Sequence, residues 1–384
     1  CWSLVGSEMC IRDRISTMEK TRKILRKSQE FHFQNGKSIS QFELAYDTYG
    51  KPNKTMSNCI LVCHAFSGSH HAAGKFDNDE KNGWWDEFIG DGKTIDTNKY
   101  FVVSVNNFGS CFGSSGPKSI CPETKKPYGI DFPDVTVLDW VKSQKILMEE
   151  LKIPHWEMVA GGSLGGMQAL QWAISYPDIV KKACVIAATA QSSPQNIALN
   201  EVAREMIKKD ENFHDGNYFE KNAIPKVGLM TARMLGHITY LSENNMQKRF
   251  GRKKQNPESK VETDVIYEIE NYLRYKGDKF SEIFDANTYI LMTKAMDEFN
   301  ICGDNENDFQ LILKKIKAKL LIISFESDWL FPSWHSKFIQ KNAMKVGISS
   351  SYVELEGSYG HDSFLFASDE YCNIVENFLN FNDG

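Results

Sequence analysis

The stretch Gly161-Gly162-Ser163-Leu164-Gly165-Gly166 decides the expected fold. The mostly apolar run Trp156–Ala160 before it predicts a buried strand, and Met167–Ala173 after it has the apolar spacing of a helix. A serine between glycines at a strand-to-helix turn is typical of a nucleophile elbow, because the turn exposes the hydroxyl and the glycines let strand and helix pass closely. The amide of Leu164 would lie beside that hydroxyl, at the start of the helix, where it can stabilise an oxyanion. The stretch therefore predicts Ser163 as a nucleophile.

Strand-like and helix-like segments alternate on both sides of this turn. Asp134–Leu151 has helical periodicity, and Thr21–Gln29 is interpreted as a basic, polar lead-in. The expected strands are Phe42–Tyr49, Cys59–Cys63, Tyr100–Val105, Ala183–Ala187, Lys319–Phe325 and Tyr352–Glu356. This alternation predicts an α/β fold of the α/β-hydrolase type, with a mainly parallel sheet and helices on both faces.

The pattern changes between residues 193 and 307, where buried strand-like runs are absent from the sequence. Helix-like segments replace them at Ala198–Lys208, Pro225–Leu241, Val261–Tyr275 and Ser281–Phe299. We expect a helical lid inserted into a core made of residues 31–192 and 308–384, and we interpret residues 1–17 as an extraneous or disordered stretch. The basic run Lys248–Lys254 is most simply a solvated loop, and a position near a phosphate-bearing substrate is the alternative.

The composition is that of an ordinary globular protein. The chain has 384 residues, is 41% hydrophobic and 25% charged, and carries a formal net charge of −5. This charge gives no electrostatic reason to expect binding to nucleic acid or membranes, and no apolar run reaches the roughly 18 residues of a spanning helix. The nine cysteines show neither a C-x-x-C pair nor zinc-ligand spacing. We therefore expect reduced thiols, a cytoplasmic location and no bound metal.

A serine nucleophile needs a base and a group that orients the base. Asp328 and His361 each follow an expected strand, at the carboxyl ends where such sheets collect their functional groups. The order Ser163, Asp328, His361 is that of α/β-hydrolase triads. His361 would take the serine proton, and Asp328 would fix the imidazole tautomer.

The loop after the strand Cys59–Cys63 should supply the second oxyanion donor, from a backbone amide near His64–Phe66. His64, His70 and His71 can also be interpreted as metal ligands, but no carboxylate or cysteine spacing supports that reading. Shaping this loop and the pocket is the favoured role for the three histidines.

From about Phe42 to Ala367 the chain resembles homoserine O-acetyltransferase, an α/β-hydrolase-fold enzyme of methionine biosynthesis. Several of the matching motifs lie in the lid, and generic hydrolases lack them. The motifs are His64–Gly68 with Ala72–Gly74, Gly83–Asp86, Gly113–Pro117, Pro127–Pro133, Gly161–Ala169, Ala232–Glu243, Tyr272–Phe280, Phe284–Asn287, Ser327–Pro332 and Tyr359–Asp362.

This resemblance implies a ping-pong reaction, in which the serine accepts acetyl from acetyl-CoA and passes it to L-homoserine. It implies that Arg233 and Asp362 hold the homoserine carboxylate and amine, and that the Phe66 and Leu164 amides form the oxyanion hole. Leu330 stands where relatives that use succinyl-CoA commonly carry arginine, so it favours acetyl. The resemblance further implies a homodimer assembled through the lid, with acetyl-CoA as co-substrate and no cofactor.

Several alternatives stay open at the level of sequence. The nearest are homoserine O-succinyltransferase and serine O-acetyltransferase. Triad chemistry alone does not separate a transferase from an ester hydrolase, because water competes with any acceptor for an acyl-serine. A non-catalytic binding protein of the same fold is a further alternative, although it would be expected to have lost a triad member.

Overall fold

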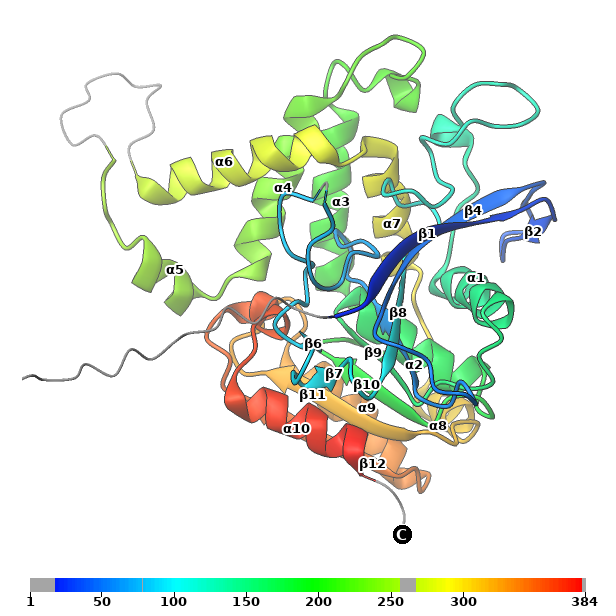
Figure 1. Ribbon diagram of the computed structural model, residues 1–384. Coiled ribbons are helices and arrows are strands. Elements are labelled where there is room, and N and C mark those ends of the chain that lie inside the picture. The colour runs from blue at the N-terminus through cyan, green and yellow to red at the C-terminus, as the bar shows by residue number, and fades with distance from the viewer. Residues whose placement is uncertain (1–17, 78, 256–266, 382–384) are drawn as a thin grey trace, which may run out of the picture.

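The computed structural model describes residues 18–77, 79–255 and 267–381 (Figure 1). Its centre is an eight-stranded sheet in the order β1-β4-β8-β5-β9-β10-β11-β12. The strands are β1 (Lys20–Lys27), β4 (Phe42–Tyr49), β5 (Cys59–Cys63), β8 (Phe101–Val105), β9 (Met158–Gly162), β10 (Lys182–Ile186), β11 (Lys319–Phe325) and β12 (Ser350–Leu355). The neighbours from β8 to β12 are all parallel, whereas β4 runs antiparallel to β1 and β8. The predicted fold class, a mainly parallel α/β-hydrolase sheet, is confirmed.

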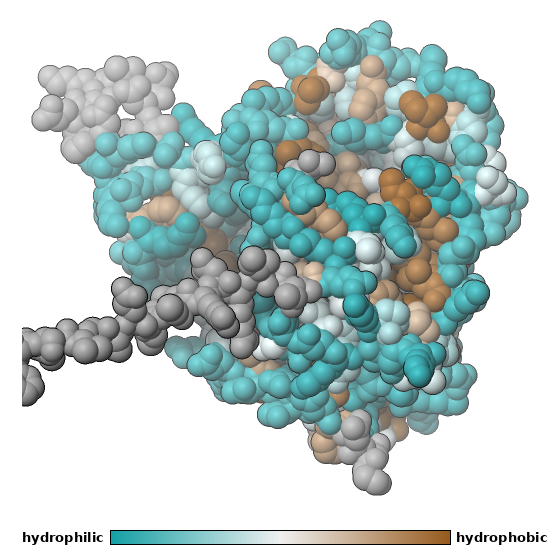
Figure 2. All heavy atoms as spheres, in the orientation of Figure 1, coloured by the Kyte–Doolittle hydropathy of each residue, from teal (hydrophilic) through white to brown (hydrophobic). Residues whose placement is uncertain are grey.

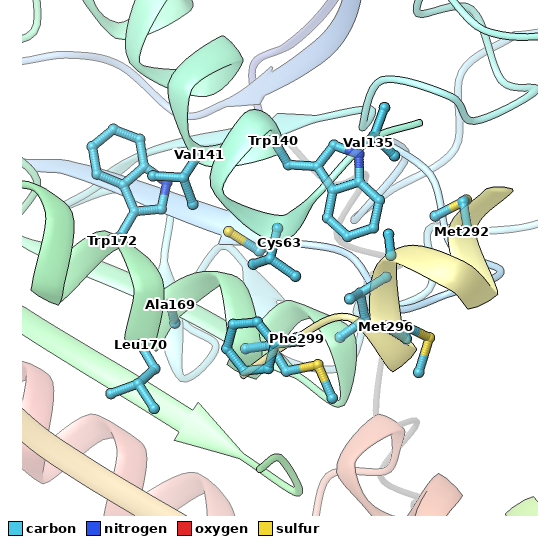
Figure 3. Packing of buried hydrophobic residues seen from close by; sticks show 14 of the residues in the cluster. Cys63, Val135, Trp140, Val141, Ala169, Leu170, Trp172, Met292, Met296 and Phe299 are labelled. Carbon is cyan, nitrogen blue, oxygen red and sulfur yellow. The ribbon is translucent and has the colours of Figure 1, made fainter. Parts of the chain in front are cut away.

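Alternate residues of each central strand point into two separate apolar cores, as the period of a strand requires. In β5, Leu61 and Cys63 belong to one core, and Ile60 and Val62 belong to the other. Figure 3 shows Cys63 in the first core, among residues of α1 and α2. Helices α1 (Val137–Glu150), α2 (Leu164–Ser175) and α9 (Ser333–Lys345) contribute to that core, and α10 (Asp369–Asn380) covers the other face.

Shorter elements complete the fold. They are β2 (Phe31–His32) paired with β3 (Ser38–Ile39), β6 (Ile89–Gly90) paired with β7 (Ile95–Asp96), and the 3-10 turns η1 (Gly129–Asp131), η2 (His214–Gly216) and η3 (Gly360–Leu365). The face in Figure 2 is mostly hydrophilic, with small groups of apolar residues among the polar ones. In the part of the chain that the structure describes, no helix combines the length and apolar character needed to cross a membrane.

The basic, polar lead-in Thr21–Gln29 was not expected to be a strand, but most of it belongs to the edge strand β1. This strand pairs along its full length with β4, from Lys20 beside Tyr49 to Lys27 beside Phe42. Its side chains are mostly exposed or half-buried. An edge strand keeps charged side chains in solvent and still pairs through its backbone, so the apolar signal that marks central strands is missing. The expectation for residues 1–17 lies outside the described residues.

Helices fill the chain between β10 and β11, and we call residues 193–307 the lid. The helices are α3 (Pro194–Lys208), α4 (Lys226–Tyr240), α5 (Glu243–Arg249), α6 (Glu268–Ile283), α7 (Ala286–Asp297) and, across the end of this segment, α8 (Glu306–Leu313). Helix α4 packs against α3 and α6, and α3 packs against α7. Figure 1 shows α3, α4, α6 and α7 grouped as a layer above the sheet.

Two expectations for the lid need correction. Ser281–Phe299 is not one helix, because α6 ends at Ile283 and the side chain of Asp285 caps α7 by accepting from the Thr288 amide at 2.8 Å. The basic run Lys248–Lys254 is not simply a loop, because its first two residues form the last turn of α5. The beginning of the expected helix Val261–Tyr275 lies outside the described residues.

Candidate active site

Ser163 occupies a strained turn between β9 and α2. Its φ of 58° lies in the left-handed region that few residues other than glycine adopt, at a cost of about 1–3 kcal/mol. The turn is tight because the end of β5 runs against it. A Cβ on Gly161 or Gly165 would lie 2.6 or 2.1 Å from the Cys63 carbonyl oxygen. These glycines therefore allow the close approach that raises the Ser163 side chain above the sheet.

Asp328 and His361 meet at the ends of β11 and β12. The Oδ2 atom of Asp328 accepts a hydrogen bond from Nδ1 of His361 at 2.8 Å, and both side chains are buried. The other oxygen, Oδ1, accepts from the backbone amides of Leu330 and Phe331 at 3.0 and 2.9 Å. Three hydrogen bonds thus hold the carboxylate and the imidazole in one fixed relation.

Opposing effects act on the pKa of His361. Burial alone would lower it, but the charge and hydrogen bond of Asp328, together with the charge of Asp362, raise the pKa above its ordinary value. The imidazole also packs against the rings of Phe331 and Phe364 at 5.2 and 5.5 Å. It is therefore held in an apolar setting where an imidazolium formed during a reaction is stabilised by the carboxylate.

A cavity of about 170 Å³ brings together residues that are distant in sequence. Ser163 and His361 line it together with Arg233 from α4 and Asp362 from η3. The structure thus places the serine, the histidine and both expected substrate-binding residues around one space, with Asp328 directly behind the histidine. Residues Trp84 and Tyr240 also line this cavity, and sequence reasoning did not assign them to the site.

Arg233 is held by aromatic rings and one hydroxyl. Its guanidinium lies 4.5 Å from the ring centre of Phe280 and 5.3 Å from that of Tyr240, and Nη1 donates to Ser67 Oγ at 3.1 Å. In the described ranges no carboxylate lies within ion-pair distance of Arg233, and its buried Nε has no hydrogen-bond partner. Burial raises the pKa of Asp362 to about 6, against the lowering effects of His361, Arg233 and Lys276. The cavity therefore presents a separate cation and carboxylate, which together suit a zwitterion.

A second cavity opens on the other side of Ser163. It is lined by apolar side chains that include Phe66, Leu235, Met296 and Leu330, and by the neutral polar residues Asn196, Asn200, Thr239 and Thr293. None of these lining residues is a lysine or arginine. The Leu330 carbonyl is fixed by a 2.8 Å hydrogen bond from Asn196. This second space suits an uncharged group next to the serine.

The loop after β5 presents the expected oxyanion donor. Neither the Phe66 amide nor the Leu164 amide donates a hydrogen bond to another described residue, so both are free to bind an anion. The carbonyl of Ala65 belongs to the same peptide unit as the Phe66 amide. It accepts from Gly68 N–H at 2.9 Å and from Nδ1 of His64 at 2.8 Å. The peptide that carries the donor is therefore fixed at its other end.

The tautomer of His64 follows from its partners. The Asn107 amide, which can only donate, lies 3.1 Å from Nε2, so the ring proton must be on Nδ1. Burial lowers the pKa of His64 to about 4, and the ring stays neutral near pH 7. From the sequence, His64 was expected only to shape the loop. The hydrogen bonds show that it connects the Ala65 carbonyl to the Asn107 amide.

His64→Asn and His64→Gln should differ in activity. An asparagine amide can reach the Ala65 carbonyl as Nδ1 does, whereas a glutamine amide reaches the position of Nε2 instead. We expect the Gln variant to lose about tenfold in acylation rate and the Asn variant much less, because misalignment of an oxyanion donor weakens transition-state binding. Stopped-flow acylation with thermal melting of both variants checks this. Equal losses would show only a packing role.

The other two histidines of this loop lie beside a buried carboxylate. His70 and His71 flank the buried Asp47 at 3.7 and 3.6 Å, and Arg22 already pairs with that carboxylate at 3.0 Å. Burial lowers the pKa of His70 to about 4. Within the described ranges, no group of three or more His, Cys, Asp or Glu side chains is placed to hold a metal ion.

Comparisons with known proteins agree on the fold. The model of the alpha/beta hydrolase fold family matches residues 58–368. The chain is 51% identical to homoserine O-succinyltransferase of Hahella chejuensis over 346 residues, which cover 90% of each chain. It is also 51% identical to the enzyme of the same name from Halorhodospira halophila over 345 residues, again 90% of each.

Solved structures carry two kinds of name. A homoserine O-acetyltransferase from Bacillus anthracis is 31% identical with a TM-score of 0.86, covering 95% of this chain and 98% of that one. Esterase E22 is also 31% identical with a TM-score of 0.86, covering 94% and 100%. The relatives thus share a fold, and their names differ in the acyl group and in whether they denote a transferase or an esterase.

Proposed function

Because this chain belongs to the α/β-hydrolase fold family and, within it, to the homoserine O-acyltransferases, we propose that it transfers acetyl from acetyl-CoA to L-homoserine. It is an acyltransferase, and the products of the proposed reaction are O-acetyl-L-homoserine and CoA, in methionine biosynthesis. One observation carries the choice of acceptor: the cavity that contains Ser163 and His361 also contains the unpaired cation of Arg233 and the carboxylate of Asp362.

The reaction would take place in two half-reactions. His361 removes the Ser163 proton as the hydroxyl attacks the thioester carbonyl, and the amides of Phe66 and Leu164 stabilise the oxyanion. The tetrahedral intermediate collapses, the carbon–sulfur bond breaks, and the proton passes from the imidazolium to the CoA thiolate. The homoserine hydroxyl then attacks the acetyl-serine and gives its proton to His361. The bond between the acetyl carbon and Ser163 Oγ breaks, and His361 returns the proton to the serine oxygen.

The uncharged second cavity supports acetyl as the acyl group. A succinyl group ends in a carboxylate, which needs a cation when it is removed from water. Leu330 and the other residues lining this space offer none. Succinyl transfer is the second candidate, since the relatives at about 50% identity are named homoserine O-succinyltransferase.

A panel of donors and acceptors tests the proposal. Acetyl-CoA or succinyl-CoA is mixed with L-homoserine, L-serine or water, and CoA release and product mass are followed. We expect acetyl-CoA consumption that depends on L-homoserine and yields O-acetylhomoserine. A preference for succinyl-CoA would overturn the interpretation of Leu330, a preference for serine would overturn the acceptor, and release with water alone would indicate an esterase.

The homoserine KM should depend on pH through Asp362. A carboxyl group with a pKa of about 6 is ionised at neutral pH and attracts the substrate ammonium group, and it loses that charge as the pH falls through about 6. We expect the KM to rise below about pH 6 in the parent enzyme, and Asp362→Asn to have a KM that is high and nearly independent of pH in this range.

Arg233→Ala should raise the KM for L-homoserine by at least about 30-fold and leave acylation by the donor less affected. Equal losses in both half-reactions would contradict this role.

We also propose that the protein is a homodimer assembled through the lid. Large apolar side chains on its helices are exposed, among them Val227 and Ile238 of α4 and Tyr275 and Ile283 of α6. Covering such side chains against a second copy would remove them from water. Light scattering after size exclusion should give twice the mass of one chain, and Val227→Asp should lower it if α4 lies in the interface.

A further inference from the structure

We propose that two cations on the lid, Lys276 of α6 and Arg249 of α5, bind the phosphate groups of the coenzyme A donor while its thioester reaches Ser163. This inference rests on the proposed use of a CoA thioester. It adds the location of the charged end of the donor, which neither the triad nor the two cavities beside the serine explain.

A continuous series of ring contacts leads from the catalytic centre to these cations. The His361 ring lies 6.3 Å from that of Tyr240, which packs against His237 at 5.8 Å. His237 contacts Tyr272 of α6, with ring centres 5.6 Å apart and Nδ1 3.4 Å from the Tyr272 hydroxyl. Tyr272 is therefore the point where the wall of the cavity meets the outer part of the lid.

Both cations rest on the ring of Tyr272. The Arg249 guanidinium lies 4.9 Å from its centre and also 4.9 Å from that of Phe250, and the Lys276 ammonium lies 5.7 Å from Tyr272. Cation–π contacts of this kind hold a cation in place without neutralising it. The two positive charges consequently share one aromatic support and remain available to an anion.

The spacing along α6 sets the distance between the support of Arg233 and the ring on which the two cations rest. Tyr272, Lys276 and Phe280 recur every four residues and so share one face of the helix. Phe280 supports Arg233 beside the serine, and Tyr272 is about 12 Å further along the helix at about 1.5 Å per residue. A donor whose thioester is at Ser163 and whose phosphates are at the end of a long arm needs such a separation.

Some other cations of the lid are paired with acids. Lys226 lies 2.7 Å from Asp278, Lys279 lies 3.0 Å from Glu282, and Arg204 lies 2.6 Å from Asp297. By contrast, no described carboxylate lies within ion-pair distance of Arg249 or Lys276. In a protein of net charge −5, two cations that share one aromatic support and have no described carboxylate beside them are suited to an external anion.

The electrostatic environment agrees with this interpretation. Burial lowers the pKa of Lys276, and the charges of Arg233, Lys81 and Arg249 lower it further, with only Asp362 acting in the opposite direction. Burial also lowers the pKa of His237 to about 3, so this neighbour is neutral near pH 7. Crowded cations are unfavourable by themselves and become favourable when a group with several negative charges binds among them, as phosphates do.

The test compares acetyl-CoA with S-acetylpantetheine, which has the same thioester and arm but no phosphate. Acylation kcat/KM is measured for the parent enzyme, Lys276→Ala, Arg249→Ala and the double variant. The control is Lys279→Ala, which removes an equal charge from the same helix at a paired position. Each of the first two changes should reduce kcat/KM for acetyl-CoA by about tenfold, with no change for S-acetylpantetheine. The KM of L-homoserine should also stay constant.

Loss of activity with both donors, or parent-like acylation by acetyl-CoA in the double variant, would overturn the inference. A change in the homoserine KM alone would assign Lys276 to the acceptor instead, and so would overturn it too. If no CoA thioester acylates the parent enzyme, the proposed function fails, whereas normal acylation in the double variant rejects only the phosphate site. If succinyl-CoA is the better donor, the same comparison is made with S-succinylpantetheine.

Discussion

Replacing Ser163 by alanine should abolish acyl transfer and leave the fold intact. The hydroxyl is the only group removed. We expect a fall in kcat of about 10⁴-fold or more, the usual cost of losing a nucleophile. Stability should change little. Serine and alanine both carry a Cβ at the φ of 58° that this turn imposes, so the backbone strain is the same in both proteins.

The measurement combines turnover with intact mass. Incubation with acetyl-CoA in the absence of L-homoserine should add one acetyl group to the parent protein and none to Ser163→Ala. Ser67→Ala is the matched control for acetylation, because Ser67 lines the same cavity and supplies no nucleophile, while its hydrogen bond with Arg233 concerns the acceptor that this incubation leaves out. Turnover by the Ser163 variant within tenfold of the parent, or an acetyl group that persists on it, would contradict an acyl-serine mechanism.

The strands at the centre of the sheet could be predicted because they are buried on both faces. Cys59–Cys63 and Lys319–Phe325 read as continuous apolar runs, and β5 and β11 have these same bounds. The edge strand β1 gave no such signal, since it is paired through its backbone and its side chains remain in solvent. An apolar sequence pattern therefore reveals only those strands whose side chains are buried.

Helix ends in the lid show the same limitation at a local scale. The apolar spacing of Ser281–Phe299 continues across the boundary between α6 and α7, because both helices pack against the same core. The boundary is set by the side chain of Asp285, which caps α7. An aspartate before Ala286-Asn287-Thr288 was the available signal, and periodicity concealed it.

Part of the candidate site could be predicted from the sequence, and part of it required the structure. Ser163, Asp328 and His361 follow from turn chemistry and chain order, and the structure places the histidine beside the aspartate and around one cavity with the serine. The fixed tautomer of His64 and the support of cations by Tyr272 depend on contacts between residues far apart in the chain. No local pattern contains them, so they required the structure.

Asp328→Asn should lower kcat by about 10³–10⁴-fold, through the tautomer of His361. In the parent protein Oδ1 accepts from two backbone amides, Leu330 and Phe331, and Oδ2 accepts from the histidine. Backbone amides can only donate, so the oxygen of the introduced amide must remain with them. Its NH₂ group then faces Nδ1, which can meet it only as an acceptor.

The ring proton therefore moves to Nε2, the atom that has to accept the proton from Ser163. The loss of negative charge also removes the interaction that raises the pKa of His361, so raising the pH should not restore activity. Nitrogen chemical shifts of the imidazole would report the tautomer, and thermal melting would show whether the fold is retained. A variant that folds, keeps the proton on Nδ1 and still loses activity would show that the charge of Asp328, and not its control of the tautomer, is what the reaction requires.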